Sequence, residues 1–359
     1  MNIELYNKAT GFDSLQADWN ALLQRSVTNT LFVTWEWQRA WWNSFGQSKQ
    51  LRLLAIRDDS GSLQAIVPLF VQDTLLDANA ALPEISVERP AARAEGKLQR
   101  TVHWVGGTEV SDYLDAIAPS DFHQQACAAW VDYLNREADW QILDLRCLPS
   151  GSPTVPTLVA LAGARGWHVQ QVREDVCPVL ELPGTWEEYL SIKLDKKQRH
   201  ELRRKIRRAE ERAQVDWQWV DGNEWEQGLD TFLRLHKLSD PEKEAFMDQT
   251  MEGFFRAVTR AALEKGWLRL SVLRFDGQPV ASYLCFDYCR DRLVYNSGFD
   301  LSSYAELSPG IVLLGYLIED AIRQGRRRFD FLQGNERYKY DLGATDTEVL
   351  RLFIRRQAV

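Results

Sequence analysis

The sequence predicts an α/β (α+β) protein with two domains of one kind, and three observations lead to this fold class. The chain has 359 residues, which is more than one hydrophobic core usually spans. The same order of elements, a helix, a hairpin, a strand, a helix and a strand, occurs once in each half. A hairpin supplies antiparallel strands and a strand–helix–strand unit supplies parallel ones, so each domain should hold a mixed, mostly antiparallel sheet flanked by helices. We expect the domains at residues 1–175 and 176–359.

The first copy starts with a tryptophan-rich helix. Residues 32–45 (FVTWEWQRAWWNSF) place Thr34 at a suitable N-cap position, and their tryptophans recur at helical spacing. Such a stripe more often faces a core than lines a ligand cleft, and we favour the core. A hairpin at 51–72, a strand at 102–107, a helix near 121–137 and a strand at 140–146 follow. The polar segment 73–100 is interpreted as an inserted loop.

The second copy repeats this order with clearer boundaries. Helices are expected at 225–236, 244–265 and 310–324, a hairpin at 268–288, and strands at 293–299 and 327–332. Ser308 is the expected N-cap of the helix at 310–324, Pro309 suits its first position, and Gly325 should end it in the left-handed conformation. Free N–H groups at a helix start attract anions. Ser308, Gly310 and Ile311 therefore form a candidate phosphate-binding site.

A strongly basic segment lies between the two copies. Residues 193–208 (KLDKKQRHELRRKIRR) hold nine Lys and Arg against two acidic residues, although the whole chain has a net charge of −8. A narrow apolar stripe through Leu202 and Ile206 fits a helix that packs along one edge. The charge indicates either an anionic partner, such as a CoA tail, a nucleotide-sugar or lipid phosphate, or RNA, or a solvated face compensated by Glu210 and Glu211. Nucleic acid is disfavoured because no aromatic or glycine-rich binding motif accompanies the segment.

Composition favours an ordinary soluble protein of the cytoplasm. Apolar residues make up 45% of the chain and charged residues 26%. No window approaches about 18 uninterrupted apolar residues, so we expect no spanning helix, and the first residues show no signal peptide. The cysteines lie at scattered positions: Cys127, Cys147, Cys177, Cys285 and Cys289. Their spacing predicts small buried residues in a reducing compartment and no metal site.

The C-terminal motifs resemble those of a known family. Gly298-Phe299-Asp300 ends a strand, Ser308-Pro309-Gly310 opens a helix, and residues 330–339 read DFLQGNERYK. This order is similar to that of the GNAT superfamily of acyltransferases. It looks most like the CelD-type proteins of cellulose and exopolysaccharide synthesis, whose tryptophan-rich and basic helices the chain also resembles. More distantly, the chain is similar to the Fem-type aminoacyl transferases of peptidoglycan bridges, which are tandem GNAT domains.

The resemblance implies acyl transfer from acetyl-CoA or another acyl-CoA to an amine or hydroxyl, such as a sugar or another cell-envelope or exopolysaccharide precursor. It implies that Asn296, Ser297 and Gly298 flank the thioester. Ser308, Gly310 and Ile311 would meet the CoA phosphates. The chain departs from the closely spaced glycines of the superfamily loop, because only Gly310 is present after residues 304–307.

The reaction needs a base for the acceptor proton and an acid for the departing thiolate. Tyr338 is the candidate acid, and Lys339 could hold a negative charge on substrate or intermediate. The candidate bases are Asp330, Glu336, Glu306 and His236. No Ser/His/Asp or Cys/His set argues for a covalent intermediate, so we expect direct attack in a ternary complex.

Two other functions stay open, and the two copies are not equivalent. The chain could be a Fem-like transferase that takes an aminoacyl group from tRNA, or a non-catalytic GNAT-shaped module of a polysaccharide-synthesis complex. The first copy has no Ser-Pro-Gly helix entry and no Tyr-Lys pair after its last strand. We therefore expect the N-terminal domain to lack the donor site and to shape the acceptor cleft.

Overall fold

Strand β12 (Thr345–Arg355), the last regular element, decides how the chain divides. The computed structural model describes residues 1–76, 97–300, 302 and 304–356. Unit 1 runs from Met1 to Asp175 and resumes at Thr347, whereas unit 2 is Val176–Asp346. The expected second domain at 176–359 therefore ends too late. The reason is that β12 pairs antiparallel with β5 (Ile142–Pro149) of unit 1.

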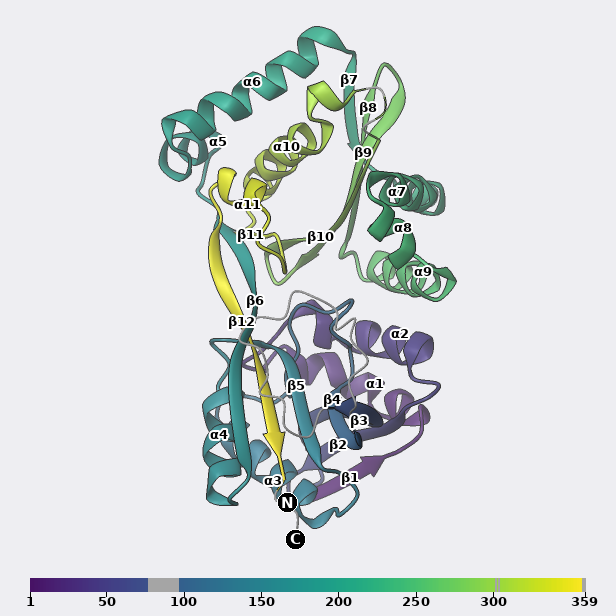
Figure 1. The fold of residues 1–359 in the computed structure, drawn as a ribbon, viewed down its shortest axis with the longest axis vertical. Helices are drawn as coiled ribbons and strands as arrows, with labels where there is room; N and C mark the ends of the chain where they lie inside the picture. Colours follow the sequence, from purple (N-terminus) through teal and green to yellow (C-terminus); the bar gives the residue numbers. More distant parts are fainter. Residues whose placement is uncertain (77–96, 301, 303, 357–359) are drawn as a thin grey trace. The chain divides into compact units, whose positions relative to one another are not determined.

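Unit 1 has a mixed sheet with helices on its faces (Figure 1). Its strands follow the order β1-β2-β3-β4-β5-β12-β6, with β4 and β5 parallel and the pairs β1–β2, β2–β3, β3–β4 and β5–β12 antiparallel. Its elements not yet given are β1 (Asn2–Tyr6), α1 (Thr10–Leu23), α2 (Trp35–Phe45), β2 (Gln50–Arg57), β3 (Leu63–Leu76), β4 (Lys97–Trp104), α3 (His123–Arg136), α4 (Thr154–Ala164) and β6 (His168–Glu181), which continues into unit 2.

The tryptophan-rich helix forms as predicted and belongs to the core. The Thr34 side chain accepts a hydrogen bond from the Trp37 backbone N–H and caps α2. Trp37, Trp41 and Trp42 are all buried. Trp41 packs on Phe70 of β3 with 5.4 Å between ring centroids. The stripe therefore covers the sheet, as favoured from its spacing.

The segment expected as a loop at 73–100 is partly strand. Strand β3 continues to Leu76 and β4 starts at Lys97, and Asp73 pairs with Arg100 across this extension. The rest of the expected loop, residues 77–96, lies outside the described residues. Polar side chains are compatible with a two-stranded extension because alternate residues face solvent.

The strands of unit 2 follow the order β6-β11-β10-β9-β8-β7. Strands β10 and β11 are parallel, and the other neighbouring pairs are antiparallel. The fold-class prediction of mixed, mostly antiparallel sheets with a βαβ unit in each copy is confirmed. The elements are α5 (Trp186–Glu188), α6 (Lys196–Arg212), β7 (Val215–Trp219), α7 (Trp225–Ser239), α8 (Pro241–Phe246), α9 (Gln249–Glu264), β8 (Leu268–Phe275), β9 (Gln278–Tyr288), β10 (Asp291–Phe299), α10 (Pro309–Arg323), β11 (Arg328–Asp330) and α11 (Arg337–Asp341).

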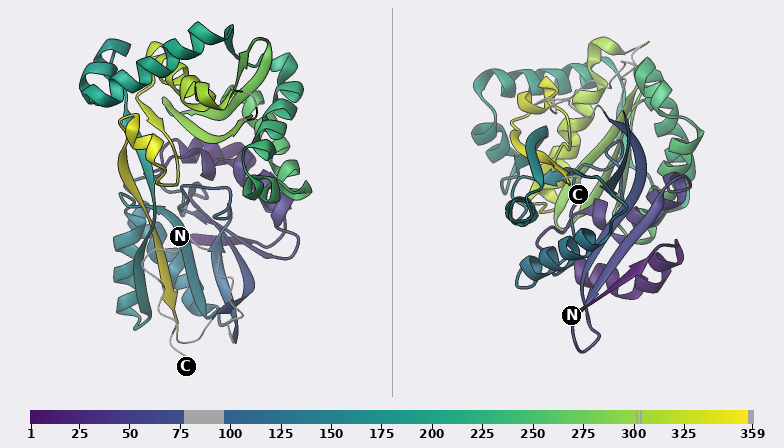
Figure 2. Two further views of the ribbon diagram at one scale, coloured as in Figure 1. Left: turned by 45° about the horizontal axis from the view of Figure 1, so that its top comes forward. Right: turned by 60° about the horizontal axis from the view of Figure 1, so that its bottom comes forward.

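Helices cover both faces of strands β8–β10. Tyr283 and Cys285 of β9 belong to the core that α10 and α6 complete. Phe286, on the other face, packs on Tyr295, which in turn contacts Phe255 of α9. Helices α7, α8 and α9 therefore lie on one side of these strands and α10 on the other (Figure 1), and Figure 2 gives two further views of this unit.

One predicted helix of unit 2 is divided. The expected helix at 244–265 splits into the end of α8 and the separate helix α9, with a break at Met247 and Asp248. The Asp248 carboxylate accepts a hydrogen bond from the Met251 N–H and so starts a new helix. The apolar spacing alone could not show this break.

The basic segment forms α6, which packs against α10. Its Leu202 is buried, and Ile206 lies against Gly315 of α10. Part of its charge is compensated by acidic side chains, as in the ion pairs Arg203–Glu187, Arg204–Glu201 and Arg207–Glu211. The anionic partner stays a prediction.

Candidate functional site

The parallel strands β10 and β11 pair over only three residues and then separate. The paired residues are Asp291 with Arg328, Arg292 with Phe329, and Leu293 with Asp330. A β-bulge follows in β10 between Val294 and Asn296. Beyond it β10 pairs with β9 alone, while the chain after β11 bonds to β6, where the Phe331 N–H donates to the Pro178 carbonyl. We call the side of residues 296–299 that faces away from β9 the open edge of β10.

The open edge presents backbone groups of Ser297 and Phe299. The Asp300 N–H donates to the Val280 carbonyl across the β9–β10 ladder. Because hydrogen-bonded residues alternate along an antiparallel strand, Gly298 and Asn296 also bond toward β9. Ser297 and Phe299 therefore direct their N–H and C=O groups to the open edge.

Two side chains satisfy Ser297 at this edge. Its N–H donates to Oδ1 of Asn296 at 2.9 Å, and its carbonyl accepts from Nζ of Lys243 at 2.8 Å. Lys243 lies on α8, and its ammonium also lies 5.7 Å from the Phe299 ring centroid. Burial lowers the pKa of Lys243, and the carboxylates Asp240 and Glu336 act against that shift. Sequence reasoning missed Lys243, because the segment PEKEAF carries no motif.

Gly298 and Gly310 bring three elements close together. A Cβ at Gly298 would lie 2.2 Å from the backbone nitrogen of His236 on α7. A Cβ at Gly310 would lie 2.6 Å from the Phe299 ring. Neither glycine has the left-handed φ that would otherwise explain it, so each is required by close packing. The two contacts place α7 and the start of α10 against β10.

His236 lies beside the bulge and is neutral at physiological pH. It is 1% exposed. Burial and then the Lys243 charge lower the pKa of His236 to about 4, against a hydrogen bond with Asn296 that raises it. Its Nδ1 has no hydrogen-bond partner within the described part of the chain. Of the four candidate bases, His236 is therefore the most deeply desolvated.

The start of α10 differs from the prediction in one respect. Pro309 occupies the first helical position and Gly325 ends the helix with φ 66°, as predicted. Ser308 is the N-cap residue, but its side chain makes no capping bond because its backbone is left-handed, with φ 53°. Its carbonyl instead accepts from the N–H groups of Ile311 and Val312. Glu306 is exposed in the 3₁₀ turn that precedes this helix.

Asp330 and Lys339 hold the loop after β11. Asp330 is buried, and its Oδ1 accepts from the N–H of Leu332, whose φ is 56°. The ammonium of Lys339 donates to the carbonyls of Leu332, Gln333 and Gly334 and lies 2.9 Å from the Glu336 carboxylate. With its three N–H groups engaged, Lys339 shapes this loop. Both residues thus fix the path of the chain toward α11, where Tyr338 lies.

Glu336 is the charged group that links the two phenols, Tyr338 and Tyr283, with Lys243. Glu336 acts electrostatically on the other three side chains, and Tyr338 acts on Tyr283. Burial raises the pKa of both tyrosines, so both phenols are protonated at neutral pH. Tyr283 was not foreseen; its β9 position in register with Ser297 brings it here.

Among the described residues, neither phenol hydroxyl has a hydrogen-bond partner; the Tyr283 side chain is buried, and Tyr338 is half-buried. Such groups are suited to bind a ligand, and together with the open edge of β10 they define the candidate site.

Metal chemistry finds no support in the ligand sets present. Residues 1–76, 97–300, 302 and 304–356 contain no group of three His, Cys, Asp or Glu that could hold a metal ion. All five cysteines are free. None of the helices described is both long and apolar enough to cross a membrane.

The comparisons with known proteins agree with this geometry. Residues 196–340 match the family described as "Acetyltransferase (GNAT) domain". Unit 2 has a GNAT acetyltransferase fold. This match contains the open edge of β10, α10, Glu336 and Tyr338, and it leaves unit 1 outside. No curated protein matches the chain in sequence.

Solved structures resemble the whole chain, unit 1 included. FemX aligns with 11% identity and a TM-score of 0.63, over 99% of this chain and 97% of its own. A conserved protein of unknown function from Bacteroides thetaiotaomicron aligns at 11% identity and 0.60, over 99% and 100%. L-PGS from Bacillus licheniformis aligns at 11% and 0.52, over 96% and 92%. At this identity the likeness concerns the fold, and the narrower CelD-type resemblance stays a prediction.

Proposed function

We propose that the protein is an acyltransferase that moves an acyl group from acyl-CoA to an amine or hydroxyl at the open edge of β10. The observation that carries this proposal is the separation of β10 from β11 after Leu293 and Asp330, beside two phenols without partners. The GNAT match to residues 196–340 supports the reaction class.

The donor would lie along the open edge. Backbone groups of Ser297 and Phe299 offer hydrogen bonds to the amides of a pantetheine arm, as an added strand would. The thioester would then reach the bulge, flanked by Asn296 and Gly298. The CoA phosphates would lie at the start of α10, where Ser308, Gly310 and Ile311 begin the helix.

Glu336 and Tyr338 are the groups best placed for proton transfer. The acceptor nitrogen or oxygen attacks the thioester carbonyl, the new bond to carbon forms, and the C–S bond breaks. Glu336 takes the acceptor proton, and Tyr338, kept protonated by its raised pKa, donates one to the thiolate. We assign Asp330 and Lys339 to positioning this loop, and we place His236 beneath the bulge as a support for Asn296.

Acceptor and donor alternatives follow from the comparisons. A sugar or other cell-envelope precursor fits the CelD-type resemblance. The likeness to FemX over nearly the whole chain favours, as a second candidate, an aminoacyl group delivered by tRNA. That donor would bind with strong salt dependence, and α6 would be a plausible contact. A non-catalytic module would have no use for the desolvated phenols.

The test compares Tyr338→Phe with Tyr340→Phe, a neighbour on α11 whose hydroxyl bonds to Asp346. Loss of the acid should lower kcat by about 100-fold while acyl-CoA affinity stays within about twofold. Affinity is measured by calorimetry and turnover by CoA release with a panel of amines and sugars. Unchanged turnover in Tyr338→Phe would contradict the assigned role, and absence of acyl-CoA binding to the wild type would contradict the proposed function.

A further inference from the structure

The ammonium of Lys243 has no carboxylate within ion-pair distance in the part of the chain that the structure describes. It donates to the Ser297 carbonyl at 2.8 Å and makes a longer contact of 3.4 Å with the Ser297 hydroxyl. Among the described residues it forms no ion pair, and Asp240 and Glu336 act on it only at longer range. Glu336 is itself engaged by Lys339 at 2.9 Å.

Other basic side chains near Lys243 do form ion pairs with carboxylates. Lys237, on the adjacent helix, lies 3.1 Å from the Glu252 carboxylate. Arg256 pairs with both Glu252 and Asp230. Lys243 is the more desolvated position, yet it lacks a carboxylate. Desolvating a charge is costly unless an opposite charge compensates it, so the missing partner has to come from elsewhere.

The direction of Lys243 indicates where that partner would be. Its Nζ reaches Ser297 at the open edge of β10 and lies 5.7 Å from the Phe299 ring centroid. The Tyr283 ring centroid lies 5.7 Å from that of the same Phe299 ring. A ligand at the edge would bond to the Ser297 carbonyl in place of the ammonium. The N–H groups of Lys243 would then be free to bind an anionic group of that ligand.

We infer that Lys243 selects a carboxylate-bearing substrate, with the carboxylate carried either by the transferred acyl chain or by the acceptor. The inference rests on the proposed function, because it requires a donor or acceptor at the open edge. It adds the substrate class, which neither the GNAT match nor the fold comparisons provide. The Tyr283 hydroxyl can donate a further hydrogen bond to the same carboxylate.

The experiment uses two matched pairs of probes on the full chain. Butyryl-CoA and succinyl-CoA both carry four-carbon acyl groups and differ by a terminal carboxylate. Glucosamine and 2-amino-2-deoxyglucuronic acid, which has a carboxylate in place of the C6 hydroxymethyl group, make the same comparison on the acceptor side when they are added to CoA-saturated protein. Calorimetry gives the four affinities for the wild type, Lys243→Met, Lys243→Arg and the control Lys237→Met, and thermal melting verifies that each variant is folded.

In one of the two pairs, we expect the probe with the additional carboxylate to bind at least about tenfold more tightly than its partner, both to the wild type and to Lys237→Met. The pair that shows the preference identifies whether the acyl chain or the acceptor carries the carboxylate. Lys243→Met should reduce the preference to within about twofold, and Lys243→Arg should retain most of it. Equal binding within both pairs, or a preference that persists in Lys243→Met, would overturn the inference while leaving the proposed function intact. If neither CoA ester binds the wild type, the proposed function fails as well.

Discussion

Each unit has a pair of parallel strands that separate after two or three paired residues, and the residues that follow the last pair differ between the units. In unit 1 the parallel strands β4 and β5 pair only at Thr101–Ile142 and Val102–Leu143. The next residues, His103 and Asp144, carry polar side chains whose Nδ1 and Oδ2 lie 3.8 Å apart. In unit 2 the corresponding residues after the last pair are Val294 and Phe331, both buried and apolar.

Unit 1 fills the space where its strands part. Arg351 of β12 donates two hydrogen bonds to the Asp144 carboxylate, from Nε at 2.6 Å and from Nη2 at 3.0 Å. The loop after β4 returns, and the Leu114 N–H donates to the Cys147 carbonyl on β5. In unit 1, therefore, the point where β4 and β5 separate is occupied by Arg351 and by the loop after β4. At the equivalent point of unit 2 lies the open edge of β10, with Lys243 beside it.

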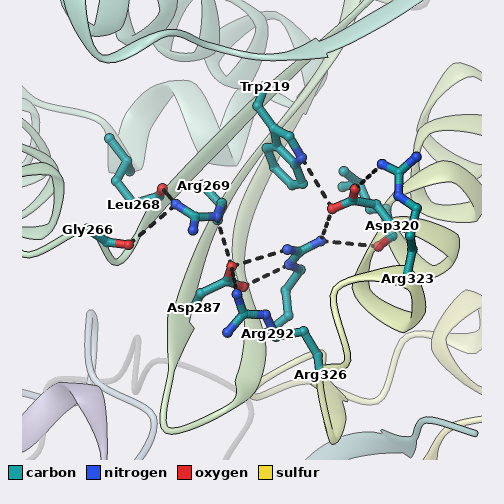
Figure 3. A network of polar contacts seen from close by, with 10 residues as sticks. Trp219, Gly266, Leu268, Arg269, Asp287, Arg292, Asp320, Arg323 and Arg326 are labelled. Atoms are coloured by element: carbon teal, nitrogen blue, oxygen red, sulfur yellow. Dashed lines mark hydrogen bonds and ion pairs between the residues drawn. The ribbon is translucent and has the colours of Figure 1, made fainter. Parts of the chain in front are cut away.

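Unit 2 puts its charged network at the other end of the strand pair. Arg292, at the start of β10, bonds to Asp287 at 2.9 and 3.2 Å and to Asp320 at 2.8 Å, under the Trp219 ring (Figure 3). Asp287 is also held by Arg269 and Arg326. In unit 2 the charged network and the open edge of β10 therefore lie at opposite ends of the β10–β11 pair.

The largest expected effect tests the rigid end. Arg292→Met should leave two buried carboxylates without their shared partner and lower the free energy of unfolding by about 4 kcal/mol. Arg323→Met removes an exposed contact to the same Asp320 at 2.6 Å and should cost less than about 1 kcal/mol. Chemical denaturation measures both. Similar losses in the two variants would show that the buried network does not anchor β10.

A smaller effect tests the filled end in unit 1. Arg351→Met removes both hydrogen bonds to the buried Asp144 and leaves it the longer contact with His103. We expect a loss of about 2 kcal/mol, between the values typical of surface and buried pairs. Acyl-CoA affinity, measured by calorimetry, should stay within about twofold of the wild type. A large loss of affinity in a folded Arg351→Met protein would mean that unit 1 takes part in donor binding.

Local signals in the sequence predicted much of the fold. Thr34, Pro309 and Gly325 act within one or two turns of chain, so their roles could be read directly and are confirmed. The two hairpins were likewise set by neighbouring residues. The second domain was expected to continue to residue 359, and it ends earlier because β12 pairs with β5, some two hundred residues earlier.

The sequence allowed some residues of the candidate site to be predicted and not others. Glu336 and Tyr338 stood in a recognisable motif, whereas Lys243 and Tyr283 reach the site through the register of β9 with β10 and the break between α8 and α9. Asp144 and Asp330 illustrate the same limit. They occupy matching LDL and FDF patterns, yet one binds Arg351 and the other the Leu332 N–H.

Amide hydrogen exchange with and without acyl-CoA tests the central claim most directly. If the donor pairs with the open edge of β10, the amides of Ser297 and Phe299 gain protection and those of residues 101–107 do not change. Protection confined to residues 101–107, or none at 296–299 under saturating acyl-CoA, would contradict the account.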